Sequence, residues 1–175
     1  MTSMLAIHDA TVAGDLEALR GAFDDAADFP NVRDECGQTC LDHAIYHGPA
    51  SLVRALLDLG ADPNYPDPGG FPALFAAIDR PTPDRHEVLA LLLAAGASVE
   101  QRGSNDYTPL HYAACRDDAV AVEILLRSGA DRDARTRIDD YATPLEEAER
   151  FGHDIGAHAL RRLTSDRARP MHEES

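Results

Sequence analysis

The sequence contains no lysine and no tryptophan, and aromatic residues make up only 6% of its 175 residues. All 16 basic residues are therefore arginine; they face 31 acidic residues, and the formal net charge is −15. The imbalance is steepest in residues 1–100, which hold 5 arginines and 16 acidic residues, a net −11. Nucleic acids and anionic membranes bind positively charged surfaces, so we expect this chain to bind neither.

Cysteines and long apolar runs are also scarce. Three cysteines, an odd number, provide no disulfide framework and suit a reducing compartment. No apolar run approaches the length of a membrane span, and the first residues lack the basic and then apolar order of a signal peptide. We therefore expect a cytoplasmic location and no membrane contact.

What the chain does contain is one short pattern of helix signals, most complete in residues 104–137. Thr108 is a candidate helix N-cap, and Pro109 follows at the first helical position, where a missing N–H costs nothing. A short apolar stripe and then a second, more apolar helix follow. Gly129 stands just past that helix, where a left-handed C-cap would lie.

The same pattern recurs along the chain at nearly constant spacing. Marker leucines at Leu41, Leu74, Leu110 and Leu145 are separated by 33, 36 and 35 residues. The uneven steps place three extra residues in the turn at 80–85, where two prolines forbid continuous helix, and two more near 138–140. We expect the inserted turn at 80–85 to be exposed and tolerant of substitution.

Thr-Pro-Leu-His-x-Ala at residues 108–113, followed by two short helices and Gly-Ala-Asp at 129–131, resembles the ankyrin repeat, which is about 33 residues long. The resemblance implies an all-α repeat solenoid of about five helix pairs with short β-turn fingers. It covers one domain, residues 1–163, and leaves 164–175 as a polar tail that we expect to be disordered. The repeats run approximately over 4–33, 34–66, 67–102, 103–137 and 138–163, with the first and last acting as caps.

Local signals at the helix starts and in the two caps predict specific contacts. Thr143 and Glu146 fit a capping box, Thr39 with Asp42 fits it less well, and the resemblance implies that His111 bonds backbone between neighbouring turns. In the caps, we expect apolar side chains to face the core, with the second helix of the last repeat opening at Phe151. These side chains are Leu16, Leu19 and Phe23 at one end, and Phe151, Ile155, Ala159, Leu160 and Leu163 at the other.

The resemblance also implies a partner site, because ankyrin-like proteins usually bind ligands with the finger tips and the exposed side of the first helices. When the exposed positions of the family's repeat are carried over to this sequence one by one, Arg80, Ala142 and Phe151 are among the residues expected on this surface. The aromatics Tyr46, Phe71 and Tyr107 would form a partner site there, or alternatively would pack on neighbouring turns. The residues predicted to bind the partner are Glu35, Gln38, Tyr46, Phe71, Asp79, Tyr107, Arg116 and Arg150.

These observations favour a non-catalytic protein-protein interaction module that is monomeric alone and acts as an adaptor, inhibitor or immunity-type protein. Because the chain is so acidic, we expect a partner with a basic surface. A structural spacer without a stable partner is another interpretation. No motif for catalysis, such as Gly-x-Ser-x-Gly or His-Glu-x-x-His, occurs, and we predict no cofactor.

The alternative from another functional class is a metal-binding or enzymatic module built on Cys36, Cys40, His43 and His47. On a helix that begins near Thr39, the last three share one face, and two thiols with two imidazoles are a common structural zinc set. Against this, Cys40 occupies the proline position of the repeat, and both histidines fall on variable positions. We therefore predict no metal site.

Overall fold

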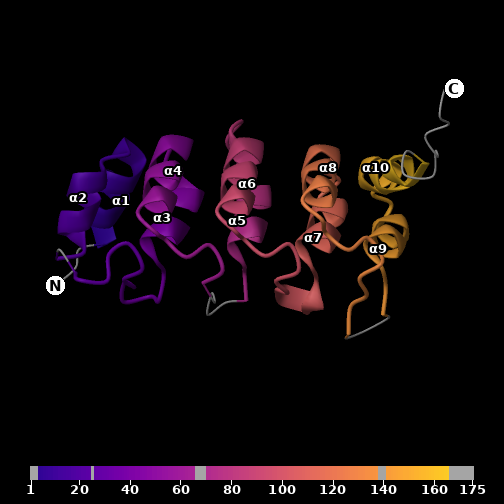
Figure 1. The fold of residues 1–175 in the computed structure, drawn as a ribbon, viewed down its shortest axis with the longest axis horizontal. Helices are drawn as coiled ribbons and strands as arrows, with labels where there is room; N and C mark the ends of the chain where they lie inside the picture. The colour runs from indigo at the N-terminus through magenta and orange to yellow at the C-terminus, as the bar shows by residue number, and fades with distance from the viewer. Residues whose placement is uncertain (1–3, 25, 66–69, 138–140, 166–175) are drawn as a thin grey trace, which may run out of the picture.

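The computed structural model describes residues 4–24, 26–65, 70–137 and 141–165, with side chains described as far as Arg162, and ten α-helices follow one another in pairs over these ranges (Figure 1). A short 3-10 helix, η1 (Ser104–Asp106), lies in one of the loops. The first helices of the pairs are α1 (Met4–Ala13), α3 (Cys40–His47), α5 (Ala73–Asp79), α7 (Pro109–Cys115) and α9 (Pro144–Phe151). The second helices are α2 (Leu16–Ala22), α4 (Ala50–Asp58), α6 (Arg85–Ala94), α8 (Ala119–Arg127) and α10 (Asp154–Ser165).

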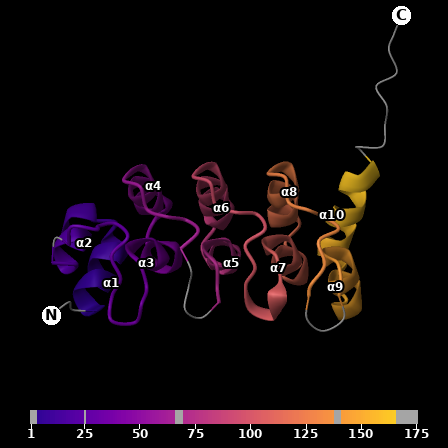
Figure 2. The same ribbon diagram turned by 60° about the horizontal axis from the view of Figure 1, so that its bottom comes forward.

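The helices form two layers. Each first helix contacts its own second helix and the first helices of adjacent pairs, while α4, α6, α8 and α10 contact one another in the same order. Figure 2 shows the second helices along one side of the row and the connecting loops, the fingers, along the other. Within the described ranges the only β-type pairing is a single bridge from Arg33 to Thr39, so the predicted all-α repeat solenoid is confirmed.

The helix starts follow from local hydrogen bonding. Thr39, Thr108 and Thr143 each accept the backbone N–H three residues on, and the side chain at that position bonds back to the threonine N–H. Two predicted capping boxes, those of Thr39 and Thr143, are therefore confirmed. The marker glycines lie just past the ends of α4, α6 and α8, and their φ of about +90° is a conformation that glycine adopts without strain. They are Gly60, Gly96 and Gly129.

The core runs through the junctions between neighbouring helix pairs. Leu41, Leu74 and Leu110 are buried at equivalent positions of three successive first helices, and Leu145 is half-buried in the last pair. In the N-terminal pair, Leu19 and Phe23 are buried as expected. One buried strip therefore extends along the stack.

The C-terminal cap differs from the expectation. Phe151 and Ile155 are 59% and 58% exposed, and Phe151 ends α9 instead of opening α10. The inward side of α10 is formed by Gly156, Ala157 and Leu160. The reason is close packing: a Cβ on Gly156 would lie 2.6 Å from the carbonyl oxygen of Ala114, so α10 meets α7 at the one position without a side chain.

The inserted turn also differs from the expectation, because Arg80 is only 3% exposed. Its guanidinium donates to the carbonyl oxygens of Ile45 and Gly48, each at 2.6 Å, at the end of α3 in the preceding pair. Asp84 closes the arrangement, since its carboxylate accepts from Nε and Nη2 of Arg80 at 2.8 Å. The hydrogen bonds from Arg80, working against burial, lower the pKa of Asp84. Arg80 thus satisfies backbone oxygens that α3 leaves without helical partners.

Three sequence expectations fall wholly or partly outside the described residues. They are the two extra residues near 138–140, the inward side chain of Leu163, and residue 166 onward of the expected tail. Helix α10 itself extends to Ser165, two residues into the segment assigned to that tail. None of the helices in the described part of the chain combines the length and apolar character that crossing a membrane requires.

The core predicts where stability resides. Leu110→Ala should lower the free energy of unfolding by about 2–5 kcal/mol, because it leaves a cavity between successive repeats. Val120, on α8, is 49% exposed, and Val120→Ala should change the free energy by about 0.5 kcal/mol or less. Urea denaturation of both variants measures the difference. Equal effects would contradict the assigned register.

Arg80 gives a second prediction. Arg80→Ala removes a buried cation that bridges two helix pairs and leaves buried carbonyl oxygens without a donor, so a loss on the order of 3–5 kcal/mol is expected. Arg54→Ala is the matched control, because Arg54 and its partner Glu87 are both exposed and such pairs contribute about 1 kcal/mol or less. Chemical denaturation of both variants decides, and a neutral Arg80→Ala would show that the turn is tolerant after all.

Candidate partner-binding face

The first helices and the fingers together form one face of the stack, and the eight predicted partner-binding residues occupy it unevenly. Four of them are exposed: Glu35, Asp79, Arg116 and Arg150. The other four are half-buried: Gln38, Tyr46, Phe71 and Tyr107. The structure brings five of the eight into two clusters: Phe71, Asp79 and Arg116 across the junction of α5 and α7, and Tyr107 and Arg150 across the junction of α7 and α9. Glu35, Gln38 and Tyr46 belong to neither cluster.

The first cluster is an aromatic floor made by Phe71, Phe75 and Tyr112. Phe75 is fully buried and stacks on Tyr112, with ring centroids 4.3 Å apart and planes inclined by 14°. Phe71 meets both rings edge-on, at 5.7 and 5.5 Å. Phe71 lies just before α5, Phe75 lies in α5 and Tyr112 lies in α7, so the floor joins two repeats. The side chains of Phe71 and Tyr112 remain partly exposed.

A polar group lies beside this floor. The Tyr112 hydroxyl donates to the Asp79 carboxylate, which also accepts two N–H groups of Arg116, with both N···O distances at 2.7 Å. The Arg116 guanidinium carbon lies 4.8 Å from the centroid of the Tyr112 ring. Burial, together with the hydrogen bond to Asp79, raises the pKa of Tyr112 to about 12, and Asp79 raises the pKa of Arg116. These raised pKa values keep Arg116 positively charged and the Tyr112 phenol neutral near pH 7.

The second cluster is centred on Glu147, which is buried on α9. The Tyr107 hydroxyl donates to Glu147 Oε2 at 3.1 Å, and Arg150 lies 3.8 Å from Oε1. Burial raises the pKa of Tyr107, and the nearby Cys115 and Glu147 act in the same direction. The charges within each cluster are paired, so the centre of the face combines partly exposed aromatics with internally balanced ion pairs.

Sequence reasoning missed Tyr112 and Glu147, and it misplaced Ala142. Tyr112 and Glu147 both occupy the x position of Thr-Pro-Leu-His-x-Ala. Arg116 follows Tyr112 by four residues, and this helical spacing was the signal that could have placed Tyr112 beside Arg116 on the face. Ala142, expected to be exposed, is buried. Its carbonyl oxygen accepts from the Thr136 N–H in the same finger and from His111 of the preceding repeat, and its own N–H donates to the Thr136 hydroxyl. Arg80 does not belong to the face either, because its guanidinium is buried against the end of α3.

The four residues of the metal hypothesis do not assemble into a ligand set. His43 Nε2 lies 2.8 Å from Asp34 Oδ2 in a buried pair, and Asp34 Oδ1 accepts the N–H groups of Cys36 and Gln38. Burial raises the pKa of the Cys40 thiol to about 12, so it stays protonated. In the part of the chain that the structure describes, no group of three or more His, Cys, Asp or Glu side chains could hold a metal ion. His43 instead fixes the finger before α3.

Comparison with known protein families decides the identity of the repeats. Residues 4–103 match the description of ankyrin repeats in three copies, and residues 105–137 match a further single ankyrin repeat. The chain belongs to the ankyrin repeat family. Ankyrin repeats mediate protein-protein interaction and typically serve as binding modules instead of enzymes.

Several curated proteins contain similar ankyrin segments. The chain is 37% identical over 119 residues to SH3 and multiple ankyrin repeat domains protein 2 of Homo sapiens, which covers 66% of this chain and 6% of that protein. It is 36% identical over 124 residues to the transient receptor potential channel pyrexia of Drosophila melanogaster, covering 70% and 12%. It is 34% identical over 104 residues to the RelA-associated inhibitor of Mus musculus, covering 59% and 12%. The ankyrin chain thus spans about an eighth or less of each of these relatives.

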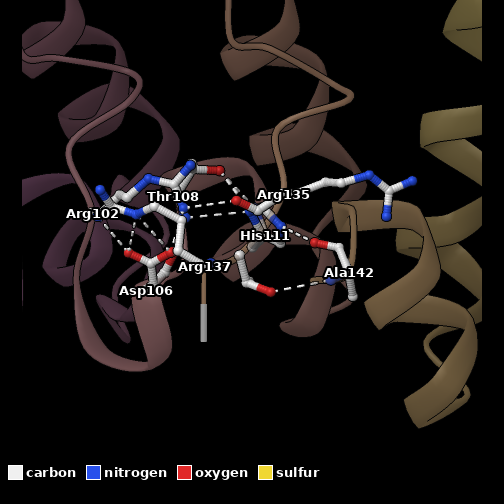
Figure 3. A network of polar contacts seen from close by, with 8 residues as sticks. Arg102, Asp106, Thr108, His111, Arg135, Arg137 and Ala142 are labelled. Carbon is white, nitrogen blue, oxygen red and sulfur yellow. Dashed lines mark hydrogen bonds and ion pairs between the residues drawn. The ribbon is translucent and has the colours of Figure 1, made fainter. Parts of the chain in front are cut away.

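The fingers that border the face are joined from one ankyrin repeat to the next. Asn64 donates to the carbonyl oxygen of Gly96 at 2.9 Å and accepts the N–H of Ser98 at 2.7 Å. Asn31 makes the equivalent pair of bonds one repeat earlier. His111 makes the cross-repeat bond that the family resemblance implied, with Nε2–H donating to the Ala142 carbonyl oxygen at 3.0 Å (Figure 3).

Asp106 links the fingers of the last two repeats. It has φ of +58° in the turn position where glycine is usual, and its carboxylate accepts from Arg102 and Arg137, each at 2.7 Å (Figure 3). Arg102 also donates to the backbone oxygen of Arg135 at 3.0 Å. The hydrogen bonds from Arg137 outweigh the effect of burial and, with the charge of Arg102, lower the pKa of Asp106 from 3.8 to about 2.

This shift predicts a pH dependence. A carboxyl group whose pKa is lower in the folded protein stabilises it above the unfolded pKa, and that contribution is lost as pH falls through the folded pKa. The wild type should therefore be more stable than Asp106→Asn by a constant amount above pH 4, and the difference should shrink between about 4 and 2. Urea denaturation of both proteins across this range measures it. Asp58→Asn, an exposed position on α4, is the control, and a pH-independent difference for Asp106→Asn would contradict the link.

Proposed function

We propose that this chain is a non-catalytic binding module that holds a protein partner with a basic surface on the face of its first helices and fingers. The observation that carries the proposal is the aromatic floor, whose Phe71 and Tyr112 rings remain partly exposed beside the Asp79–Arg116 ion pair. Partly exposed aromatics in a well-packed setting are typical of interface hot spots, because they bury a large area without ordering a flexible side chain.

Charge supports the basic partner. The net charge is −15, and residues 1–100 contribute −11 of it. The paired charges of Asp79 with Arg116 and of Glu147 with Arg150 leave the acidic excess on the surrounding surface. A field of this kind attracts a basic protein from a distance, whereas the aromatic floor acts only after contact.

The mode of action we infer is occupancy. In the cytoplasm, a monomer of this kind would act as an adaptor, an inhibitor or an immunity-type protein by covering a basic site on its partner. Two of the three cysteines are poor nucleophiles, because burial raises the pKa of Cys115 to about 11 and that of Cys40 to about 12. The name of the RelA-associated inhibitor describes an inhibitory protein with a related segment, which is compatible with this role.

The acidic charge should act on the association rate constant, and the aromatic floor on the dissociation rate constant. The partner is first captured from the native cell with the full chain, and binding is then measured by surface plasmon resonance at two salt concentrations. Association should slow as salt rises, because screening acts over about 8–10 Å near physiological ionic strength. Phe71→Ala should speed dissociation by an amount equivalent to about 2 kcal/mol or more.

Controls separate loss of contact from loss of fold. Phe71 contacts Phe75 and Tyr112, so the thermal unfolding of Phe71→Ala is compared with that of the wild type before binding is measured. Val120→Ala, on the layer of second helices, should leave both rate constants unchanged. If the association rate does not change with salt, the proposal of a basic partner is wrong. If Phe71→Ala folds normally and its complex dissociates at the wild-type rate, the partner binds another face.

A further inference from the structure

The group at the junction of the third and fourth repeats has the composition of a cation site. Tyr112 offers the face of an aromatic ring, Phe75 backs it by stacking, and the Asp79 carboxylate stands at its edge. An aromatic face beside a carboxylate is the environment that a guanidinium favours, because the ring attracts the cation and the carboxylate accepts two parallel N–H bonds. In this protein, the chain itself fills the site with Arg116.

Arg116 is held in a way that allows it to leave. It follows α7 as its C-cap, four residues after Tyr112, so it reaches the ring by folding back over its own helix. Its side chain is 51% exposed, whereas that of Asp79 is only 29% exposed. The less exposed parts of the site are therefore the Tyr112 ring and the Asp79 carboxylate, and the half-exposed Arg116 side chain covers them. Another guanidinium can take over the bonds that Arg116 makes, two to Asp79 and one to the Tyr112 hydroxyl, so the exchange keeps the number of hydrogen bonds.

We infer that this site receives an arginine side chain of the partner, and that Arg116 is a placeholder which the partner's arginine displaces. The inference rests on the proposed function, since it assumes a basic partner on this face. The incoming guanidinium makes the same two bonds to Asp79 and the same contact with Tyr112. A lysine cannot reproduce them, because its ammonium lacks the planar pair of donors.

The placeholder also has a role in the free protein. With Arg116 in place, the Asp79 carboxylate is neutralised, which discourages adventitious basic ligands from settling on the aromatic floor. A partner gains net affinity only when its neighbouring residues contact the floor as well, because the exchange of one arginine for another is nearly balanced. The site therefore favours an arginine set in an apolar surface over an isolated positive charge.

The alternative is that Arg116 serves only to join two repeats, and the two interpretations predict different effects of removing it. As a placeholder, its removal opens a site and strengthens binding of an arginine ligand. As a strut, its removal weakens the fold and opens nothing. A probe that does not depend on the natural partner separates these outcomes.

The test uses an octapeptide of alternating arginine and glycine, with an octapeptide of alternating lysine and glycine as the matched probe, at low salt. Binding to the full chain is followed by NMR shifts of the Tyr112 ring. Arg116→Ala should bind the arginine peptide about 3–10-fold more tightly than the wild type does, in line with a cation–π contact and an exposed ion pair. The lysine peptide should gain less than about twofold, as a general charge effect. Adding Asp79→Asn to Arg116→Ala should abolish the gain.

Arg127→Ala controls for the change in net charge, because Arg127 lies on α8 and is exposed. Arg116→Gln provides a second opening of the site if Arg116→Ala fails to fold, since glutamine keeps a polar side chain that is shorter than that of arginine and carries no charge. Equal gains for the two peptides, or an equal gain in Arg127→Ala, would overturn the inference. So would the absence of a gain in both Arg116 variants.

The captured partner distinguishes failure of this inference from failure of the proposed function. If Phe71→Ala weakens the complex and Arg116→Ala also weakens it, the face binds the partner but Arg116 is a direct contact, and the placeholder role is wrong. If Phe71→Ala leaves the complex unchanged, the proposed face itself is wrong, whatever the peptides show. A complex that Arg116→Ala strengthens and Asp79→Asn weakens supports both.

Discussion

Burial between neighbouring repeats is the constraint on which this structure depends. A pair of helices seven to twelve residues long cannot cover its own apolar side, so each pair is completed by the next. Leu41, Leu74 and Leu110 occupy equivalent buried positions for this reason. The two terminal pairs differ from the inner pairs, because each of them has a neighbour on one side only. At the C-terminal end, α10 turns Gly156 and Leu160 inward and leaves Ile155 exposed.

The junctions also carry polar links that a single repeat could not make. Arg80 reaches from the third repeat to the carbonyl oxygens at the end of α3, and Asn64 and His111 bond the backbone of the following finger. Arg80 and Asn64 satisfy backbone groups that the short helices and tight turns leave without a partner. His111 adds a second bond to the Ala142 carbonyl oxygen, which also accepts the Thr136 N–H. The geometry between repeats is thus held by hydrogen bonds as well as by packing. A side chain at such a junction serves stability even where it faces the proposed binding surface.

The candidate face illustrates this double role. Phe71 and Tyr112 meet across a junction and remain partly exposed, so the same contact supports the stack and presents an aromatic surface. The two interpretations of the aromatics that the sequence left open are therefore not exclusive. Pre-positioned rings lose little conformational freedom when a partner covers them, which favours their use in recognition. The adjoining ion pairs, in contrast, are already satisfied within the chain.

The sequence by itself determined what is local or periodic. The steps between marker residues identified the repeats, Thr39 and Thr143 specified helix starts, and Gly129 specified a left-handed turn. Tertiary structure alone decided which residues meet across a junction, as Asp79 does with Tyr112 and Arg80 with Ile45. Such partners stand 33 and 35 residues apart, and their pairing depends on how α5 packs against α3 and α7 in the assembled stack. A repeat pattern specifies equivalent positions, but side chains of different length and charge at those positions find their partners only when the stack is assembled.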